Sequence, residues 1–485
     1  MGTCSRARAL LTVTAVMLTT AAATAPTGRA QAPVPAPSPT AACAQLAPIA
    51  LPCTLLGKAT EALSAACRRA GVPDAQCTLP LAKRVTRAEK DAYLTSAVHR
   101  NAQFQSRLGD ALPLLQAPWL GTHNSFNSVS EEFTASRSDS NQQLSLTDQL
   151  DIDIRSLEID LHYLARSGAP GGREVVVCHG QGPSALDAGC TSEPPFTAVL
   201  PEVANWLNAP GHADEVLLLY LEDDMENDAA YPLAVATLDA VLRRPDGRSL
   251  IYRPAAGTRA ANGCSPLPLT LTRAQVRASG ARVVLVGKCA KGWASNVHDW
   301  NPVHVESGRT AAYRPYPACD GTYARSVYAT KLVRYYEDST LVATVIDPAT
   351  PSVDPEALTP AKVAAMTACG VGLFGFDQLL PQDGRIAASI WSWAAGQPKA
   401  TATCTVQGTD ARWRTSRCTV ARRAACIRSG TRWTLTAKAV PFSRARKACR
   451  SRGARFAVPR SGLQNQQLHA AAGGPHAVWI AHRTR

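Results

Sequence analysis

The chain has 485 residues, 46% of them hydrophobic, and a net charge of +14. This apolar fraction excludes a disordered chain, and the length allows two or three domains. Residues 401–485 carry 17 Lys and Arg against Asp410 alone, whereas residues 31–400 have a balance of −5, so any argument from positive charge applies to the tail only.

Residues 1–30 have the pattern of an export signal. Arg6 and Arg8 precede an apolar run, and a small-residue cleavage site follows near Ala30. The run is poor in Leu and Ile, which favours a cleaved signal over an uncleaved membrane anchor. Residues 31–41 are rich in Pro and are expected to form a linker, so the sequence predicts a secreted protein.

The cysteines suggest disulfides rather than a metal site. Beyond Cys4 they form three groups, each with an even number of cysteines. The sequence contains no Cys-x-x-Cys pair, the spacing typical of zinc sites. In an exported protein each group is expected to close its own bridges. The groups are Cys43, Cys53, Cys67 and Cys77; six cysteines from Cys178 to Cys369; and Cys404, Cys418, Cys426 and Cys449.

Residues 42–108 are predicted to form a helical subdomain that contains the first cysteine group. Ala, Leu, Gln and Arg dominate this segment, and its breaks fall near Pro73 and Pro80. No residue pattern in it indicates catalytic chemistry.

Residues 109–398 are predicted to form an α/β domain. Short β-branched or apolar runs alternate with stretches that leave room for crossover helices, as in parallel sheets covered by helices. Eight such strands predict an irregular (β/α)₈ TIM-type barrel. The predicted strands are 119–125, 155–163, 174–179, 215–221, 282–287, 341–346, 370–376 and 389–393.

Residues 399–485 are predicted to form a separate small module. They contain four cysteines, three tryptophans and dense arginine, a composition typical of a disulfide-held β or α+β unit.

Polar residues cluster at the ends of the first four predicted strands, where a barrel places its catalytic groups. Glu158 and Asp160 are two apart on one strand, so their side chains share a face. A shared cation would offset the cost of burying both, and oxygen ligands suit Ca²⁺ or Mg²⁺, with Asn124 and Glu222 able to add further oxygens. The alternative is a pair of salt bridges, for example to Arg155 or Lys288.

Two histidines flank this carboxylate pair. His123 ends the first predicted strand and His179 ends the third. Two imidazoles can act as general base and general acid, while a hard cation beside them can stabilise phosphoryl charge. The combination predicts metal-assisted cleavage of a phosphodiester.

The four segments resemble the catalytic half of calcium-dependent phosphoinositide-specific phospholipase C. The matching motifs are His123-Asn124, Arg155-Ser156-Leu157-Glu158-Ile159-Asp160, His179-Gly180 and Leu221-Glu222. The resemblance implies Ca²⁺ bound by Asn124, Glu158, Asp160 and Glu222, with His123 and His179 acting on the phosphodiester. It also implies that Lys288 contacts substrate phosphate, although an ordinary surface lysine is an equal alternative.

The resemblance also implies a mechanism. The inositol 2-hydroxyl would attack phosphorus, after Glu158 or His123 removes its proton, and His179 would protonate the departing diacylglycerol oxygen. The products would be diacylglycerol and an inositol phosphate, cyclic at first. Metal-independent bacterial relatives place Asp after the first His and Arg where the cation would lie. Asn124 and the second carboxylate, Asp160, favour the metal-dependent type.

The C-terminal module resembles the first half of a C-type-lectin-like domain, through Trp433-Thr434-Leu435, Ala448-Cys449 and Val478-Trp479-Ile480. The chain stops where the calcium- and sugar-binding half of such a domain would begin. The positive charge of the module suggests attachment to an anionic membrane or cell wall. Nucleic acid is not the expected partner, because an exported enzyme would rarely encounter it. No obligate protein partner is indicated.

Two other functions are compatible with this pattern. A glycerophosphodiester phosphodiesterase is also a barrel with a Glu-x-Asp metal pair, but its His-Arg-Gly opening is replaced here by Gly121-Thr122-His123-Asn124. A non-catalytic surface-binding protein could keep the barrel as a scaffold, because a fold does not fix a function.

Overall fold

The computed structural model describes residues 85–128, 130, 140–179, 190, 193–255, 257, 259, 263–289, 293, 295–308, 316, 326–338, 358–428 and 432–484. The predicted signal, the linker, the first cysteine group and the predicted strand 341–346 lie outside these residues. Across the described parts of the chain, the longest apolar helices fall short of what a membrane crossing requires.

Two helices open the described chain. Helix α5 spans Arg87–Leu94 and helix α6 spans Ala97–Gly109. The side chains of Thr86 and Ser96 cap their first turns by accepting hydrogen bonds from main-chain N–H groups. The described end of the predicted helical subdomain is therefore helical.

The larger sheet has the strand order β2-β1-β3-β5-β6-β4. Strands β1, β3, β5, β6 and β4 run parallel to one another. The bounds are β1 Ser156–Ala165, β2 Arg173–Val177, β3 Leu217–Asp223, β4 Ser265–Pro266, β5 Val283–Gly287 and β6 His298–Asp299.

A second parallel sheet contains β7 (His304–Gly308), β8 (Leu332–Tyr336) and β9 (Leu373–Gly375). Residues 119–122 join the two sheets, because they form parallel bridges both to the β9 segment and to β1. Within the described residues no strand pairing joins β6 to β7. The fold is mixed α/β, and the closed eight-stranded barrel that the sequence predicts is not seen there.

Two strand predictions need correction, and two strands of the smaller sheet were missed. Strand β2 runs antiparallel to β1, so the predicted parallel strand at 174–179 instead forms a hairpin with its predecessor. Residues 389–393 follow a helix and form a single bridge at Trp393 rather than a strand. Strands β7 and β8 were not predicted, because the charged Glu306 and Arg334 interrupt their apolar pattern.

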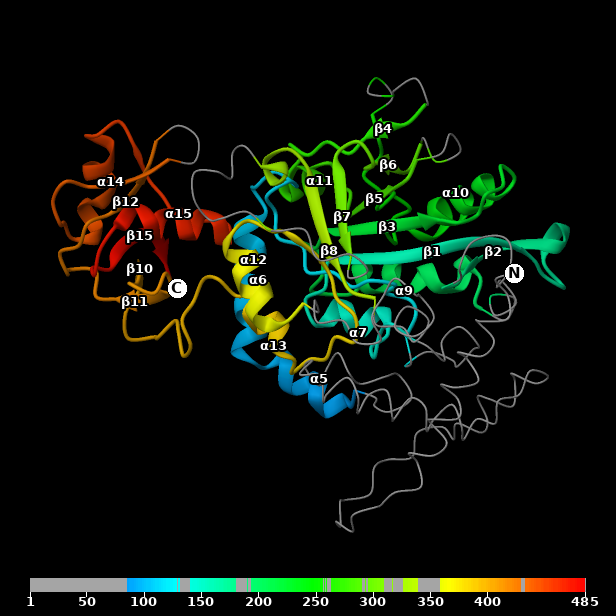
Figure 1. Ribbon diagram of the computed structural model, residues 1–485, viewed down its shortest axis with the longest axis horizontal. Coiled ribbons are helices and arrows are strands. Elements are labelled where there is room, and N and C mark those ends of the chain that lie inside the picture. The colour runs from blue at the N-terminus through cyan, green and yellow to red at the C-terminus, as the bar shows by residue number, and fades with distance from the viewer. Residues whose placement is uncertain are drawn as a thin grey trace, which may run out of the picture.

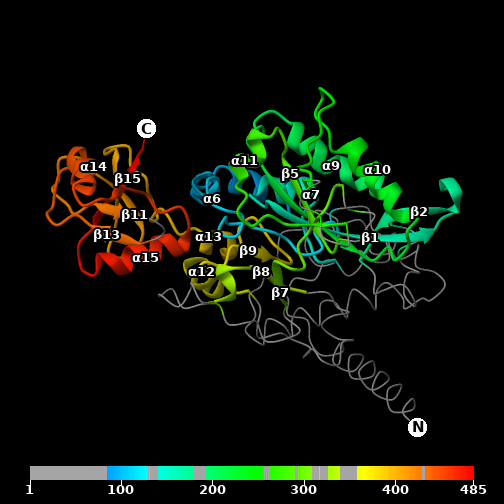
Figure 2. The same ribbon diagram turned by 90° about the horizontal axis from the view of Figure 1, so that it is seen from above.

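The remaining helices cover the sheets (Figures 1 and 2). Helices α9 and α10 contact each other and β2. Alternate β1 residues, Leu157, Ile159 and Leu161, are buried in the core on this outer side, which leaves Glu158 and Asp160 on the opposite face. The bounds are α7 Leu146–Asp151, η3 Pro170–Gly172, α9 Phe196–Asn208, α10 Ala230–Val241, α11 Arg273–Ala278, η8 Val327–Ala329, α12 Pro360–Ala368 and α13 Gly384–Ala388.

The C-terminal module contains two three-stranded sheets, β11-β10-β15 and β13-β12-β14, and two helices. It lies to one side of the main sheets, beyond α6 and α12 (Figure 2). The bounds are β10 Cys404–Gln407, β11 Trp413–Ser416, β12 Ala425–Ile427, β13 Trp433–Leu435, α14 Phe442–Arg450, β14 Arg455–Phe456, α15 Gly462–Ala472 and β15 Val478–Arg483.

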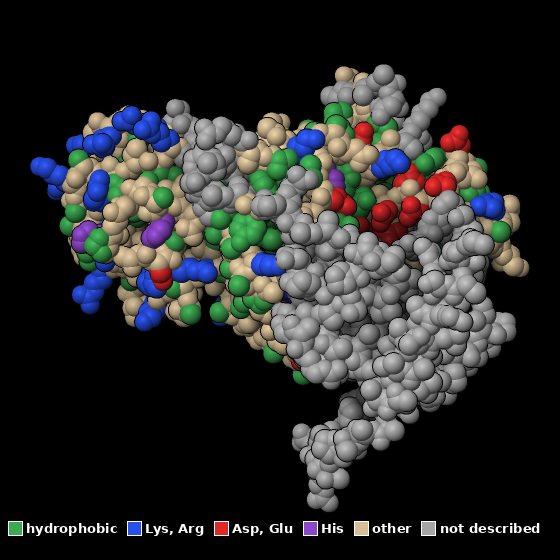
Figure 3. Space-filling view, in the orientation of Figure 1, with side chains coloured by type: hydrophobic (Ala, Val, Ile, Leu, Met, Phe, Trp, Pro, Cys, Tyr) green, Lys and Arg blue, Asp and Glu red, His purple; other side chains and the backbone are tan. Residues whose placement is uncertain are grey.

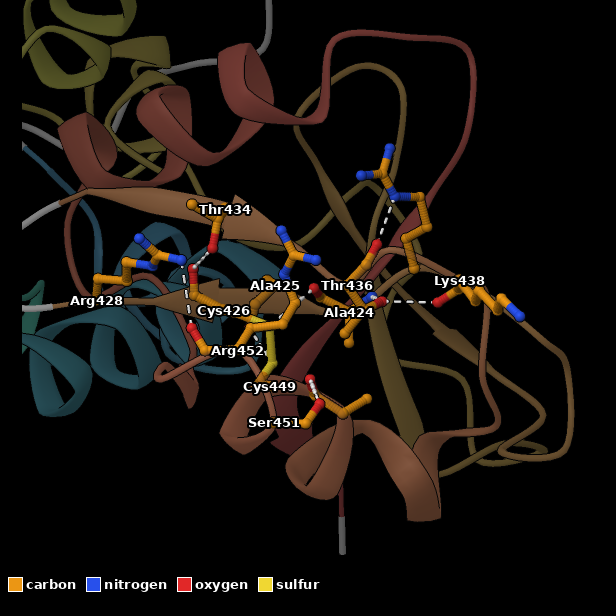
Figure 4. The surroundings of a disulfide bond; sticks show 12 residues. Ala424, Ala425, Cys426, Arg428, Thr434, Thr436, Lys438, Cys449, Ser451 and Arg452 are labelled. Atoms are coloured by element: carbon orange, nitrogen blue, oxygen red, sulfur yellow. Dashed lines mark hydrogen bonds between the residues drawn. A yellow bond between two sulfur atoms is a disulfide. The ribbon is translucent and has the colours of Figure 1, made fainter.

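Disulfides form within the predicted groups. The module closes Cys404–Cys418 and Cys426–Cys449, the second of which ties α14 to β12 (Figure 4). The central group closes Cys178–Cys190 and Cys264–Cys289. The predicted use of cysteine as local staples is confirmed for these four bridges.

Candidate active site

Five of the predicted site residues lie together at the carboxyl edge of the strands. His123 and Asn124 directly follow residues 119–122, and Glu158 and Asp160 lie on β1. Glu222 on β3 is the parallel register partner of Asp160. Parallel strands end at the same edge of a sheet, which is why residues far apart in the sequence meet here.

Three carboxylates form the acidic centre of this site. Oxygen atoms of Glu158, Asp160 and Glu222 lie within 4.8 Å of one another. Figure 3 shows acidic side chains gathered in a hollow over β1 and β3. The structure therefore brings together the carboxylates that the sequence predicts as cation ligands.

A buried arginine that the sequence analysis did not identify contacts this cluster. Arg334 of β8 donates from Nη1 to Glu158 Oε1 at 3.2 Å and from Nη2 to Glu158 Oε2. It also donates to Glu306 Oε1 at 2.8 Å. Burial would lower the pKa of Arg334, but Glu158 and Glu306 raise it well above its usual value. The guanidinium is therefore charged, and it compensates Glu158.

The other two carboxylates, Asp160 and Glu222, are not compensated by this guanidinium, and their ionised forms are destabilised. Burial raises the pKa of Asp160 well above its usual value, and Glu222 and Glu158 raise it further. Burial, Glu158 and Asp224 together raise the pKa of Glu222 to about 8. A cation at this position would remove the repulsion that these shifts express.

The amide of Asn124 faces Asp160 in the same cluster. With its nitrogen toward Asp160, the amide donates to Oδ2 at 2.8 Å and to Oδ1 at 3.2 Å, and its oxygen accepts from His179 Nε2 at 3.3 Å. With the amide turned the other way, the oxygen of Asn124 would lie equally close to the Asp160 carboxylate oxygens. Two oxygens lie this close when both coordinate one cation. The donor set therefore fits a hard cation.

His123 lies beside a carboxylate that the sequence analysis also missed. Its Nδ1 lies 3.2 Å from Asp377 Oδ1, and its ring lies 4.9 Å from the ring of Tyr336 between centroids. Burial alone would lower the pKa of His123, but Glu158, Asp377 and Asp338 raise it to about 9. His123 is therefore protonated at neutral pH.

Asp377 is held in place by its own network. Asn141 Nδ2 donates to its Oδ2 at 2.8 Å, and its main-chain N–H donates to Glu337 at 3.0 Å. The predicted strand 370–376 ends one residue before Asp377, so the signal for a strand-end carboxylate was present in the sequence.

His179 differs from His123 in its charge. Burial lowers its pKa, and the charged His123 lowers it further against the opposing effect of Asp338. His179 is therefore neutral at pH 7. The preceding residue, Cys178, is fully buried and bonded to Cys190, which anchors the end of the β2 segment.

Lys288 occupies the rim rather than the interior. It follows Gly287, the register partner of Leu221, so it lies at the same sheet edge as Glu222. Its side chain is exposed. This position leaves Lys288 apart from the buried groups.

Comparison with known proteins identifies the family. Residues 78–383 match the Rv2075c PI-PLC-like domain. The chain is 58% identical over 442 residues to the uncharacterized proteins Rv2075c and MT2135 of two Mycobacterium tuberculosis strains, covering 91% of each chain. The chain belongs to the Rv2075c PI-PLC-like family. The family match includes every candidate site residue and ends before the C-terminal module.

Solved structures with similarity to this Rv2075c PI-PLC-like chain include two bacterial phosphatidylinositol-specific phospholipases C. The protein from Listeria monocytogenes is 16% identical, with 60% of this chain and 97% of that chain covered and a TM-score of 0.37. The protein from Staphylococcus aureus is 12% identical, with 61% and 98% covered and a TM-score of 0.37.

Proposed function

We propose that the protein is a phosphodiesterase of the phospholipase C type that cleaves phosphatidylinositol-type lipids. The products would be diacylglycerol and an inositol phosphate, cyclic at first. The observation that carries this proposal is the placement of His123, beside Asp377, and His179, 3.3 Å from the Asn124 amide, at one edge of a buried carboxylate cluster. One imidazole can hydrogen-bond to the phosphoryl group while the other protonates the leaving oxygen.

We further propose that Ca²⁺ is the resident cofactor, held by Asn124, Glu158, Asp160 and Glu222. The raised pKa values of Asp160 and Glu222 support this proposal, because a bound cation would stabilise their ionised forms. When bound, the ion would acidify the attacking hydroxyl and neutralise phosphoryl charge.

The protein's own groups suggest their roles. The imidazolium of His123, oriented by Asp377, can donate a hydrogen bond to a phosphoryl oxygen. Glu158 and His123 both stay candidates for the base, because a cation bound beside Glu158 would lower the pKa of His123 again. His179 can protonate the leaving oxygen only after its pKa rises, and the negative charge of a bound phosphodiester would raise it.

Arg334 supports a second version of the same activity. Its charged guanidinium already compensates Glu158. A metal-independent enzyme would need a fixed cation at the place that this guanidinium occupies. Turnover that persists in a chelator would therefore favour Arg334 over a metal ion as the cation that serves the reaction.

The test is phosphorus NMR of the purified protein acting on phosphatidylinositol, with Ca²⁺ and then with a chelator. A cyclic inositol phosphate signal is expected, and His179→Ala should reduce its rate by about 100-fold or more. The exposed His476, far along the chain in the C-terminal module, gives the matched control His476→Ala, which should leave the rate unchanged.

Three outcomes would contradict the proposal. Release of glycerol phosphate from a glycerophosphodiester, without a cyclic product, would indicate the neighbouring phosphodiesterase class. Full activity of His179→Ala would exclude its role as the acid. Inactivity on both substrates would indicate a non-catalytic protein on this scaffold.

We also propose that the protein is secreted and attaches to an anionic surface, a membrane or a cell wall, through its C-terminal module. Helix α14 supports this, because Arg444, Arg446, Lys447 and Arg450 are all exposed on it. Figure 3 shows basic side chains spread over the module. The C-type-lectin resemblance remains a prediction.

A further inference from the structure

A groove of about 940 Å³ lies between helix α6 and the end of strand β15. Helix α6 belongs to the N-terminal part of the described chain and β15 to the C-terminal module. The two meet directly, since the ring centroids of Phe104 and His482 are 5.1 Å apart. A second hollow of about 350 Å³ shares His482 and Arg483 with the groove and extends it toward α14.

The lining of the groove is basic. Arg100, Arg107 and Arg483 line the larger hollow, and Arg446 lines its extension. Among the described residues that line either hollow, none is acidic. Clustered guanidinium groups without carboxylates favour an anionic ligand, because they raise the local concentration of negative charge.

Several of these arginines are available to a ligand. The ion pairs found among the described residues include none from Arg107, Arg446 or Arg483. The guanidinium of Arg483 lies over the ring of Phe442, 5.1 Å from its centroid, which orients it without neutralising its charge.

Aromatic and amide side chains accompany the charges. The half-buried ring of Phe104 lines the hollow, packed against the buried Trp393 at 5.7 Å between ring centroids, and Gln397 and Gln103 line the same hollow. Aromatic surfaces and amides beside arginines suit a ligand that has both C–H faces and polar groups, as an anionic carbohydrate has.

The surface is poorly suited to membrane insertion. The large hydrophobic side chains that are well exposed in the described structure are Leu233 and Val420. Neither lines the groove. Insertion into the acyl region requires exposed apolar side chains, so a concave basic groove favours a soluble anionic chain over a lipid surface.

We propose that the groove between α6 and β15 binds an anionic carbohydrate chain. This refines the proposed attachment of the C-terminal module, but it does not depend on catalysis. The site is separate from the carboxylate cluster of the reaction site. Because its described lining contains no carboxylate, binding is expected to be insensitive to chelators.

The test is titration calorimetry of the full-length protein with heparin as an anionic carbohydrate, dextran as a neutral one and polyphosphate as an anion without sugar. Heparin should bind, dextran should not, and polyphosphate should bind more weakly per charge. The double variant Arg107→Gln/Arg483→Gln should weaken heparin binding by about tenfold or more, because two direct charge contacts are lost.

The matched control is Arg417→Gln/Arg452→Gln, which removes the same charge from exposed positions of the module outside the groove. It should change heparin affinity by less than about twofold at physiological salt. Equal weakening by both variants would overturn the proposal, as would equal affinity for polyphosphate, or tighter binding to phosphatidylglycerol vesicles. Repeating the titration with His179→Ala protein separates this result from failure of the proposed reaction.

Discussion

At the scale of single residues, the site is defined by unequal charge among similar groups. His123 is held protonated by the carboxylates around it, whereas burial keeps His179 neutral. Glu158 has a guanidinium partner, whereas Asp160 and Glu222 have raised pKa values. The same residue types therefore have different chemistry because their surroundings differ.

The raised carboxylate pKa values predict how stability depends on pH. Glu222 has a pKa of about 8 in the folded chain against an ordinary value of 4.5, so its contribution is fully present below pH 4.5. As the pH rises from there to about 8, the unfolded chain releases a proton that the folded chain retains, and stability is lost. The melting temperature of chelated protein should therefore fall over this interval, and Ca²⁺ should restore it most at the alkaline end.

The variant Asp160→Asn tests the origin of this loss. Removing one carboxylate should raise the melting temperature of chelated protein at alkaline pH and reduce its increase with Ca²⁺. The exposed Asp91 of α5 provides the control Asp91→Asn, which should change neither. Differential scanning fluorimetry measures both effects. An unchanged calcium response of Asp160→Asn would show that Asp160 is not a ligand.

At the scale of secondary structure, the hairpin of β1 and β2 positions His179. Strand β2 is antiparallel to β1, and the segment after it is fixed by the Cys178–Cys190 disulfide and by donation from Cys178 N–H to Asp160 O at 3.3 Å. His179 therefore depends on a hairpin and a staple, rather than on the end of a parallel barrel strand.

Loss of this staple should affect turnover more than binding. Cys178→Ser/Cys190→Ser is expected to lower kcat by about tenfold or more with little change in KM, because misplacing a proton donor affects the transition state most. The control Cys426→Ser/Cys449→Ser removes a bridge of the C-terminal module, which lies outside the matched domain. Steady-state kinetics distinguish the two, and equal loss in both variants would point to general destabilisation.

At the scale of the whole molecule, Arg334 connects the two sheets through the site. It lies on β8 in the smaller sheet and holds Glu158 on β1 in the larger one. The pair is buried at both ends. It therefore contributes to the arrangement of the sheets as well as to the charge of the site.

Breaking this pair on one side should destabilise the protein strongly. Arg334→Met leaves Glu158 as a buried carboxylate without its partner and is expected to cost about 3–5 kcal/mol. The double variant Arg334→Met/Glu158→Gln should recover part of this loss, because the buried charge is removed as well. Urea denaturation measures both. A single variant as stable as the parent protein would contradict a role for the pair in joining the sheets.

Local patterns in the sequence were sufficient for much of the site. The two-residue period of a strand places Glu158 and Asp160 on one face, and the ends of predicted strands indicated His123 and Glu222. The even cysteine groups likewise indicated local bridges. These features depend only on neighbours along the chain, so a single sequence contains them.

The tertiary structure decided which distant residues meet. Arg334 is 176 positions from Glu158, and Asp377 is 254 positions from His123. Strand β8 also lacked a recognisable apolar pattern because its buried central residue is charged. Whether a buried charge in a strand is tolerated depends on its partner across the fold. The sequence thus determined the residue types and faces of the site, and only the packing of the sheets determined its charge balance.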